Sequence, residues 1–146
     1  MRLAYLNPDN KLRASVLTDP AFTRRNTKDN TPCVLHVEMV PGSRVSVDVA
    51  AKGGGSENKS KFKMMNPSDS IVDWVSGMLP QMGAGWCPPG MLGIGIGGTA
   101  EHCVLLAKQA LMEPIDMGPL KARGAKTDIE ALRIEIFDKV NALGIG

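Results

Sequence analysis

The chain has 146 residues, enough for one ordinary domain with a buried core, and 43% of them are hydrophobic, as in typical globular proteins. A net charge of +2 with dispersed lysines and arginines, and an aromatic content of 4%, argue against a nucleic-acid-binding surface. No apolar run approaches the roughly 18 residues of a membrane helix, and the N-terminus has no signal-peptide pattern.

The first third of the chain predicts a loop followed by a hairpin. Residues 1–32 are rich in Asn, Asp, Pro and Thr, which favours irregular structure. Residues 33–51 alternate apolar and polar side chains around Pro-Gly-Ser, which predicts a β-hairpin with one buried face. A glycine triplet, 53–55, follows. It indicates a flexible turn, or else a backbone that passes close to a ligand or takes a positive φ, and both interpretations stay open.

The middle of the chain predicts a helix and then a short strand. Residues 66–82 begin with Asn-Pro-Ser-Asp and continue with apolar residues at helical spacing, so we expect a helix that Pro80 ends or kinks. Residues 90–96 are short, apolar and rich in glycine and isoleucine, which favours a buried strand.

Two further helices are expected towards the C-terminus. Residues 99–112 carry an apolar stripe, and residues 113–127 read as a loop because Pro and Gly interrupt them. The last helix is expected over 127–144, where Thr127 and Glu130 have the spacing of a capping box.

Gly93, Gly95 and Gly98 satisfy the G-x-G-x-x-G fingerprint of dinucleotide-binding proteins. In that fold the first glycine ends the strand. Here the alternation of glycine and isoleucine places Gly93 and Gly95 inside the expected strand, where glycine more often permits a close backbone approach. A nucleotide-binding domain built on 93–98 therefore remains only a weaker alternative.

The chain has three cysteines at wide spacing, which form no disulfide framework and favour a reducing cytoplasm. Cys33 begins the expected hairpin and Cys103 lies on an expected helix, so both are predicted to be small buried residues. Cys87 differs because Trp86 precedes it and two prolines follow it, which fixes the direction of the thiol. No histidine is an evident catalytic partner, and a role as ligand or nucleophile stays open beside a purely structural one.

Three long segments occur in a fixed order: AAKGGGSENKSKFKMMNPSDS, GAGWCPPGMLGIGIGGTAE and LLAKQALMEPIDM. In these segments, and in RRNTKDNTP and KVNALGIG, the chain resembles the alpha-type region of iron–sulfur hydro-lyases, the class I fumarate hydratases and L-tartrate dehydratases. The resemblance covers essentially all of 1–146 and implies that this is the middle part of the alpha-type catalytic domain. It implies an α+β fold, an antiparallel sheet that includes 33–51 and 90–96 and is flanked by helices.

The resemblance implies reversible addition of water to the double bond of a small dicarboxylate, on a 4Fe-4S cluster with one open iron that acts as a Lewis acid. It assigns Cys87 as a cluster ligand. Gly55, through its backbone, and Arg13, through a bidentate guanidinium contact, are assigned to the substrate.

Other parts of the family pattern have no counterpart in this sequence. The family's Cys-Gln-Asp-Thr-Gly-like segment, its third cluster cysteine and the acid/base residues of its beta-type region are not present among the 146 residues. The resemblance therefore implies that two of the three cysteine ligands lie outside this chain and that no catalytic residue lies inside it. We expect this chain alone to hold no stable cluster and to have no hydratase activity.

The resemblance also implies partners. We expect a beta-type domain or subunit as a partner, and we expect the longer protein to form a homo-oligomer. Neither nucleic acid nor a membrane is an expected partner. The sequence leaves open which diacid is the substrate and whether the beta-type region is fused or separate. The main alternative is a non-catalytic fragment that serves only as a folding or assembly module.

Overall fold

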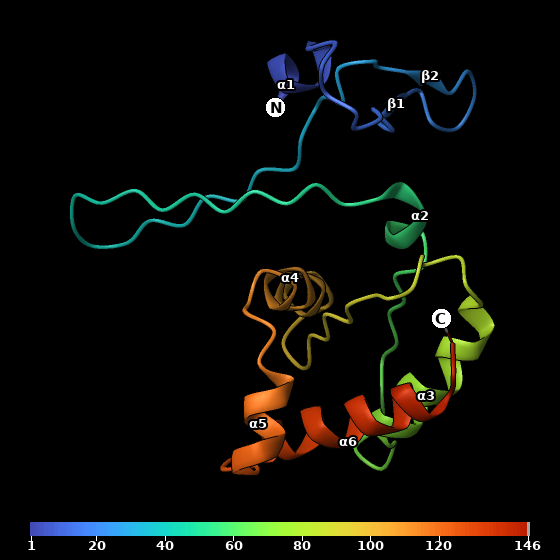
Figure 1. The fold of residues 1–146 in the computed structure, drawn as a ribbon, viewed down its shortest axis with the longest axis vertical. Helices are drawn as coiled ribbons and strands as arrows, with labels where there is room; N and C mark the ends of the chain where they lie inside the picture. Colours follow the sequence, from blue (N-terminus) through green and yellow to red (C-terminus); the bar gives the residue numbers. More distant parts are fainter. Residues whose placement is uncertain (146) are drawn as a thin grey trace. The chain divides into compact units, whose positions relative to one another are not determined.

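The computed structural model describes residues 1–145, and these fall into two units, residues 1–47 and residues 48–145. Figure 1 draws the elements of both units in chain order. The first unit contains α1 (Arg2–Leu6), β1 (Leu17–Thr18) and β2 (Arg25–Asn26). The second contains α2 (Gly54–Glu57), α3 (Ile71–Met82), α4 (Ala100–Ala110), α5 (Met117–Arg123) and α6 (Asp128–Ala142). No helix in the described part of the chain is long and apolar enough to cross a membrane.

The first unit is organised by side-chain to backbone hydrogen bonds. Strands β1 and β2 pair antiparallel, with Leu17 opposite Asn26. Asn30 Oδ1 accepts from the amides of Ser15 and Val16, at 2.8 and 3.1 Å, because short amide side chains readily bond nearby backbone. Within the described first unit Asp29 alone is buried. The predicted irregular segment is therefore largely irregular, with a two-stranded sheet inside it.

The predicted hairpin over 33–51 is wrong for this structure. No strand is assigned between these residues, which Figure 1 draws as a plain trace, and every side chain in the segment is exposed. A two-stranded hairpin is marginal in water unless a further strand or a helix covers its apolar face, and no described residue does so here. The exposed apolar side chains are Val34, Leu35, Val37, Met39, Val40, Val45, Val47 and Val49.

We expect trypsin to cleave first after Arg44, because exposed backbone without regular structure opens to proteases most easily. Arg123 is the internal control, because it ends α5 and donates to Glu130. Limited proteolysis followed by intact-mass spectrometry checks this order. A first cut within α5 or α6 would contradict it.

The core of the second unit lies between α3 and α6. The predicted helix over 66–82 exists but begins at Ile71, where the Ser70 side chain accepts from the amide of Asp73 at 3.1 Å. Pro80 falls in the last turn, so the helix continues to Met82 instead of ending there. The buried core side chains are Val72, Val75, Leu79 and Met82 from α3 and Ile136 from α6.

Helix α6 confirms the expected helix and one half of the expected capping box, since the Glu130 side chain accepts from the amide of Lys126 instead of that of Thr127. Thr127 accepts from the amide of Glu130 at 3.2 Å. The predicted loop over 113–127 is wrong in part, because it contains α5, with Leu120 only 1% exposed. Pro119 is tolerated because it stands in the first turn, where its missing N–H breaks no helical bond. Gly124, with φ +77°, follows α5.

The segment 90–96 lies between the core and α4 without forming the predicted strand. Leu92 and Ile94 pack against the core cluster. The alternate residues, Gly93 and Gly95, face the backbone of α4. Alternate residues of this segment therefore face opposite sides, the core on one side and helix α4 on the other. The segment itself pairs with no strand among the described residues. The α+β class stands through the helices and the β1–β2 sheet, whereas the sheet predicted from 33–51 and 90–96 is not formed.

The two glycines that face α4 are there because no side chain fits. A Cβ at Gly93 would lie 2.2 Å from the Ala107 carbonyl oxygen, and one at Gly95 would lie 2.0 Å from the Cys103 carbonyl oxygen. The space that a nucleotide phosphate would need beside these glycines is filled by α4. The fingerprint spacing thus has a packing explanation.

Glu130 ties α5 to α6 and gives the chain a pH-dependent contact. Arg123 donates to both of its carboxylate oxygens, at 3.0 and 2.5 Å, and the Lys126 amide donates at 2.7 Å. The Arg123 guanidinium, then the Lys126 amide, lowers the pKa of Glu130 from 4.5 to about 2.

A carboxyl whose pKa is depressed by folding stabilises the folded state above its unfolded pKa and loses that contribution as it protonates. We therefore expect stability to fall as the pH drops from 4.5 towards about 2, and to fall less steeply in Glu130→Gln. Urea unfolding across this range checks the slope, with Glu113→Gln as the surface control. Equal slopes in the wild type and Glu130→Gln would rule out the contribution.

Candidate functional site

Cys87 lies in a turn that directly follows α3. Met82, the last residue of α3, is buried in the core, and Trp86 packs against the same core. Gly83 takes φ +57°, which glycine adopts without steric cost, and reverses the chain after the helix. The turn is therefore anchored by apolar packing before and within it, while Cys87 itself is exposed.

The backbone of Cys87 is held in the left-handed region, with φ +60°. A residue with a Cβ pays for this conformation, which persists only where the surroundings enforce it, as often happens at functional sites. The Cys87 amide donates to the Ala84 carbonyl at 3.0 Å. Pro88 follows directly, and the Trp86 ring fills the space where a Cβ of Gly90 would stand, 2.4 Å away. The backbone from which the Cys87 side chain projects is thus held by its neighbours.

The glycine triplet forms the start of α2 and lies against the Cys87 turn. Ser56 donates to the Trp86 carbonyl oxygen at 3.0 Å. A Cβ at Gly55 would stand 3.4 Å from the Gly85 carbonyl oxygen, and one at Gly85 would stand 2.6 Å from Lys59 Cε. None of the three glycines takes a positive φ, which removes that reason for the triplet, while a close approach of the Gly55 backbone to a ligand stays a prediction. The structure brings Gly55 and the Cys87 turn together.

Helix α2 is fixed in turn by ion pairs. Glu57 accepts from Lys52 at 2.5 Å and from Lys108 of α4. The Lys108 ammonium first, then that of Lys52, lowers the pKa of the Glu57 carboxyl below its ordinary value. The carboxylate is therefore charged near neutral pH, and it links α2 to the helix that packs on Gly93 and Gly95.

The third predicted site residue, Arg13, belongs to the first unit. It is exposed on the coil between α1 and β1. An exposed guanidinium is available for a bidentate contact with a carboxylate. The contacts of the second unit do not test the prediction that Arg13 contacts the substrate, and it stays a prediction.

The other two cysteines differ from each other. The prediction that Cys33 is buried in a strand is wrong: it is exposed, because the hairpin in which it was placed is not formed. Cys103 is half-buried on α4, and its thiol donates to the Gly95 carbonyl oxygen at 3.0 Å, which fits a packing role. Among residues 1–145 no three His, Cys, Asp or Glu side chains are grouped so that they could hold a metal ion.

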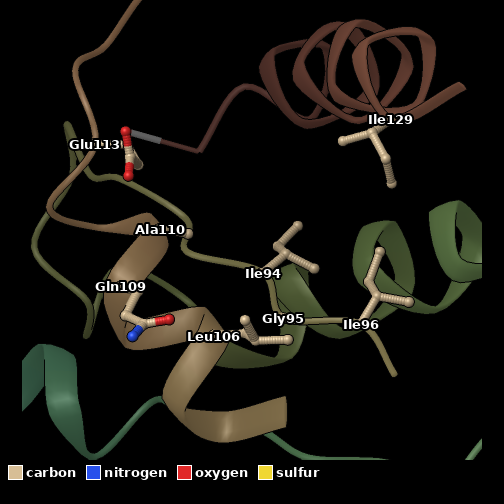
Figure 2. A pocket seen from close by; sticks show the side chains of 8 residues that line it. All are labelled: Ile94, Gly95, Ile96, Leu106, Gln109, Ala110, Glu113 and Ile129. Atoms are coloured by element: carbon tan, nitrogen blue, oxygen red, sulfur yellow. The ribbon is translucent and has the colours of Figure 1, made fainter. Parts of the chain in front are cut away.

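An open depression of about 360 Å³ lies elsewhere on the second unit, and Figure 2 shows the side chains around it. Its lining is mostly apolar, and its one charged group is the carboxylate of Glu113. A dicarboxylate would meet like charge and apolar surface there, so the depression is a poor site for such a ligand. The lining residues are Ile94, Gly95, Ile96, Leu106, Gln109, Ala110, Glu113 and Ile129.

Two residues beside the Cys87 turn were not singled out from the sequence. Ser56 bonds the turn and the Lys59 side chain runs along it. The available signal is the polar Ser-Glu-Asn-Lys at 56–59, directly after the glycine triplet, which favours a polar ligand or a hydrogen-bonded turn. It did not indicate that the partner of Ser56 would be 30 residues further on.

Comparisons with known proteins identify the family of the chain. The family model for fumarate hydratase (Fumerase) matches residues 1–146. A putative L(+)-tartrate dehydratase subunit alpha of Methanocaldococcus jannaschii is 37% identical over 133 residues, 86% of this chain and 45% of that protein. The L(+)-tartrate dehydratase subunit alpha of Escherichia coli (strain UTI89 / UPEC) is 28% identical over 131 residues, 88% of this chain and 42% of that protein.

The chain spans less than half the length of these curated relatives. No solved structure matches it significantly. A match to the family model over all 146 residues, supported by a relative with 37% identity, leaves one conclusion. The chain belongs to the fumarate hydratase (Fumerase) family.

Proposed function

We propose that this chain is part of a 4Fe-4S hydro-lyase that interconverts fumarate and malate, or converts tartrate to oxaloacetate. The observation that carries the proposal is the exposed Cys87, held at φ +60° in a turn against the glycine triplet. Membership of the fumarate hydratase family supports the reaction class. The names of the relatives, tartrate dehydratase subunit alpha, support a beta-type partner and a diacid substrate.

Among the cysteines of the described residues, Cys87 is the one proposed as a cluster ligand. It is exposed and can offer a thiolate, whereas Cys103 is engaged with the Gly95 carbonyl. Cys33 is exposed too, but it lies on the irregular segment 33–51 and not in a turn held against the glycine triplet. No group of three metal-binding side chains is present within residues 1–145. We therefore propose that the other cysteine ligands come from polypeptide outside this chain. When bound, the cluster supplies a Lewis-acidic iron to the substrate.

The chain's own residues would bind and orient the substrate. Arg13 would pair with a substrate carboxylate through two parallel N–H···O bonds, which fix the plane of that carboxylate. Gly55 would present its backbone without a side chain in the way. Proton transfer would fall to residues outside this chain, in the beta-type region. The proposed location of the protein is the cytoplasm.

The test is turnover of diacids. The chain is combined anaerobically with iron, sulfide, the remaining alpha-type polypeptide and a beta-type subunit of the family, and fumarate and tartrate are supplied separately. We expect one of them to be converted, as followed by ultraviolet absorbance and chromatography. Failure of both, with all parts folded and the cluster present, would favour the folding or assembly module.

Arg13→Lys separates charge from geometry. It keeps the positive charge but loses the bidentate fork, so we expect KM for the diacid to rise about tenfold with a smaller change in kcat. Arg44→Lys, on the exposed segment 33–51, is the matched control. An unchanged KM in Arg13→Lys would remove Arg13 from the substrate site.

A further inference from the structure

The peptide unit between Trp86 and Cys87 is hydrogen-bonded at both ends. Its carbonyl oxygen accepts from Ser56 Oγ at 3.0 Å, and its N–H donates to the Ala84 carbonyl at 3.0 Å. A peptide unit is planar, so fixing both ends fixes the plane from which the Cys87 Cα and its side chain project. Together with the φ of +60° at Cys87, this plane determines the direction in which the Cys87 Cβ, and with it the side chain, leaves the backbone.

One of these two bonds is local, and the other crosses the fold. The amide of Cys87 bonds a residue of its own turn, whereas Ser56 reaches a carbonyl 30 residues away in sequence. The bond is partly buried, so water competes for it less than it would on an open surface. A serine within a helical turn commonly bonds a carbonyl of its own helix, and Ser56 bonds the cysteine turn instead.

Helix α2, which contains Ser56, is itself held in place by its neighbours. Its neighbour Glu57 is held by Lys52 and by Lys108 of α4. On the next turn, the Lys59 side chain runs against Gly85, where a Cβ would stand 2.6 Å from Lys59 Cε. The Ser56 hydroxyl is therefore presented from a fixed segment and does not depend on a mobile loop.

The left-handed backbone at Cys87 needs support from its surroundings, and the bond from Ser56 to the Trp86 carbonyl can supply it. A non-glycine residue leaves that conformation unless its surroundings hold it there. We propose that Ser56 is a positioning residue for Cys87: the Ser56 hydroxyl holds the Trp86–Cys87 peptide plane so that the thiol faces the cluster. This inference rests on the proposed role of Cys87 as a cluster ligand. Ser56 has no contact with substrate in this role.

The experiment uses amide hydrogen exchange of this chain, resolved at the Cys87 amide. Ser56→Ala removes the bond, Ser56→Thr keeps the hydroxyl, and Ser60→Ala is the matched control on an exposed serine nearby. We expect exchange at Cys87 to be about fivefold faster in Ser56→Ala, close to wild type in Ser56→Thr, and unchanged in Ser60→Ala. Far-UV circular dichroism establishes that all variants fold.

Unchanged exchange at Cys87 in folded Ser56→Ala would overturn the inference, as would an equal increase in Ser60→Ala. A second readout uses the chain reconstituted anaerobically with iron, sulfide and the remaining alpha-type polypeptide, which supplies the other proposed cysteine ligands. There Ser56→Ala should lose the visible absorbance of the cluster to a chelator about fivefold faster than the wild type, with rescue in Ser56→Thr. If Cys87→Ser keeps the cluster, the ligand role fails, while the exchange data still decide whether Ser56 holds the turn.

Discussion

Replacing Gly95 by alanine should lower the free energy of unfolding of the second unit by about 3 kcal/mol or more. The new Cβ would stand 2.0 Å from the Cys103 carbonyl oxygen and 2.7 Å from the Ala107 amide nitrogen. Both atoms belong to the backbone of α4, so no rotamer change relieves the overlap and the helix must move away from the segment 90–96. That movement would also strain the bond from the Cys103 thiol to the Gly95 carbonyl.

Gly77→Ala is the matched control for this substitution. Gly77 lies inside α3, its φ is not positive, and a Cβ there would meet nothing within 4 Å. The same change should therefore stabilise the second unit by about 0.5–1 kcal/mol, because alanine loses less backbone entropy in a helix. Equal effects of the two substitutions would mean that α4 does not lie against Gly95.

Leu79→Ala should also lower the free energy of unfolding of the second unit, by about 3 kcal/mol. Leu79 is 0% exposed and lies in the cluster between α3 and α6, where truncation removes apolar contacts and leaves a cavity. With about 4–8 °C of melting temperature lost per kcal/mol in a unit of this size, the midpoint should fall by about 12 °C or more. Leu3→Ala, at a leucine 83% exposed in α1, should change stability by less than about 0.5 kcal/mol.

Tryptophan fluorescence during urea unfolding measures the effects of Gly95→Ala and Leu79→Ala. Both tryptophans of the chain, Trp74 and Trp86, lie in the second unit and pack against its core. The signal therefore reports unfolding of this unit even if the first unit unfolds separately. A Leu79→Ala midpoint equal to that of Leu3→Ala would place Leu79 outside the core.

Helices were more predictable from this sequence than strands because helix signals are local. The apolar spacing of α3 and the cap at Thr127 act within one segment, and both predictions hold, although α3 begins at Ile71. The hairpin over 33–51 depended on a surface to cover its apolar face, which a period-two pattern cannot supply. Helix α5 was missed because Gly118 and Pro119 look like a loop, although proline is tolerated in a first turn.

The sequence pointed to candidate site residues but not to the contacts that hold them. The composition around Cys87 indicated a fixed thiol, and the structure adds the positive φ and the bond from the Cys87 amide to Ala84. The contact between Ser56 and Trp86 joins segments 30 residues apart, so no local pattern reveals it. Gly93 and Gly95 matched a nucleotide fingerprint because close packing on a helix and close approach to a phosphate both require a missing side chain.

The direct test of the central claim, that Cys87 is a cluster ligand, is anaerobic reconstitution of this chain with iron, sulfide and the remaining alpha-type polypeptide, which supplies the other proposed cysteine ligands. Visible absorbance and electron paramagnetic resonance are recorded on the wild-type chain, on Cys87→Ser, and on Cys103→Ser as the matched control. We expect a cluster signal in the wild type and in Cys103→Ser, and its loss in Cys87→Ser. A signal of equal size in Cys87→Ser would contradict the claim.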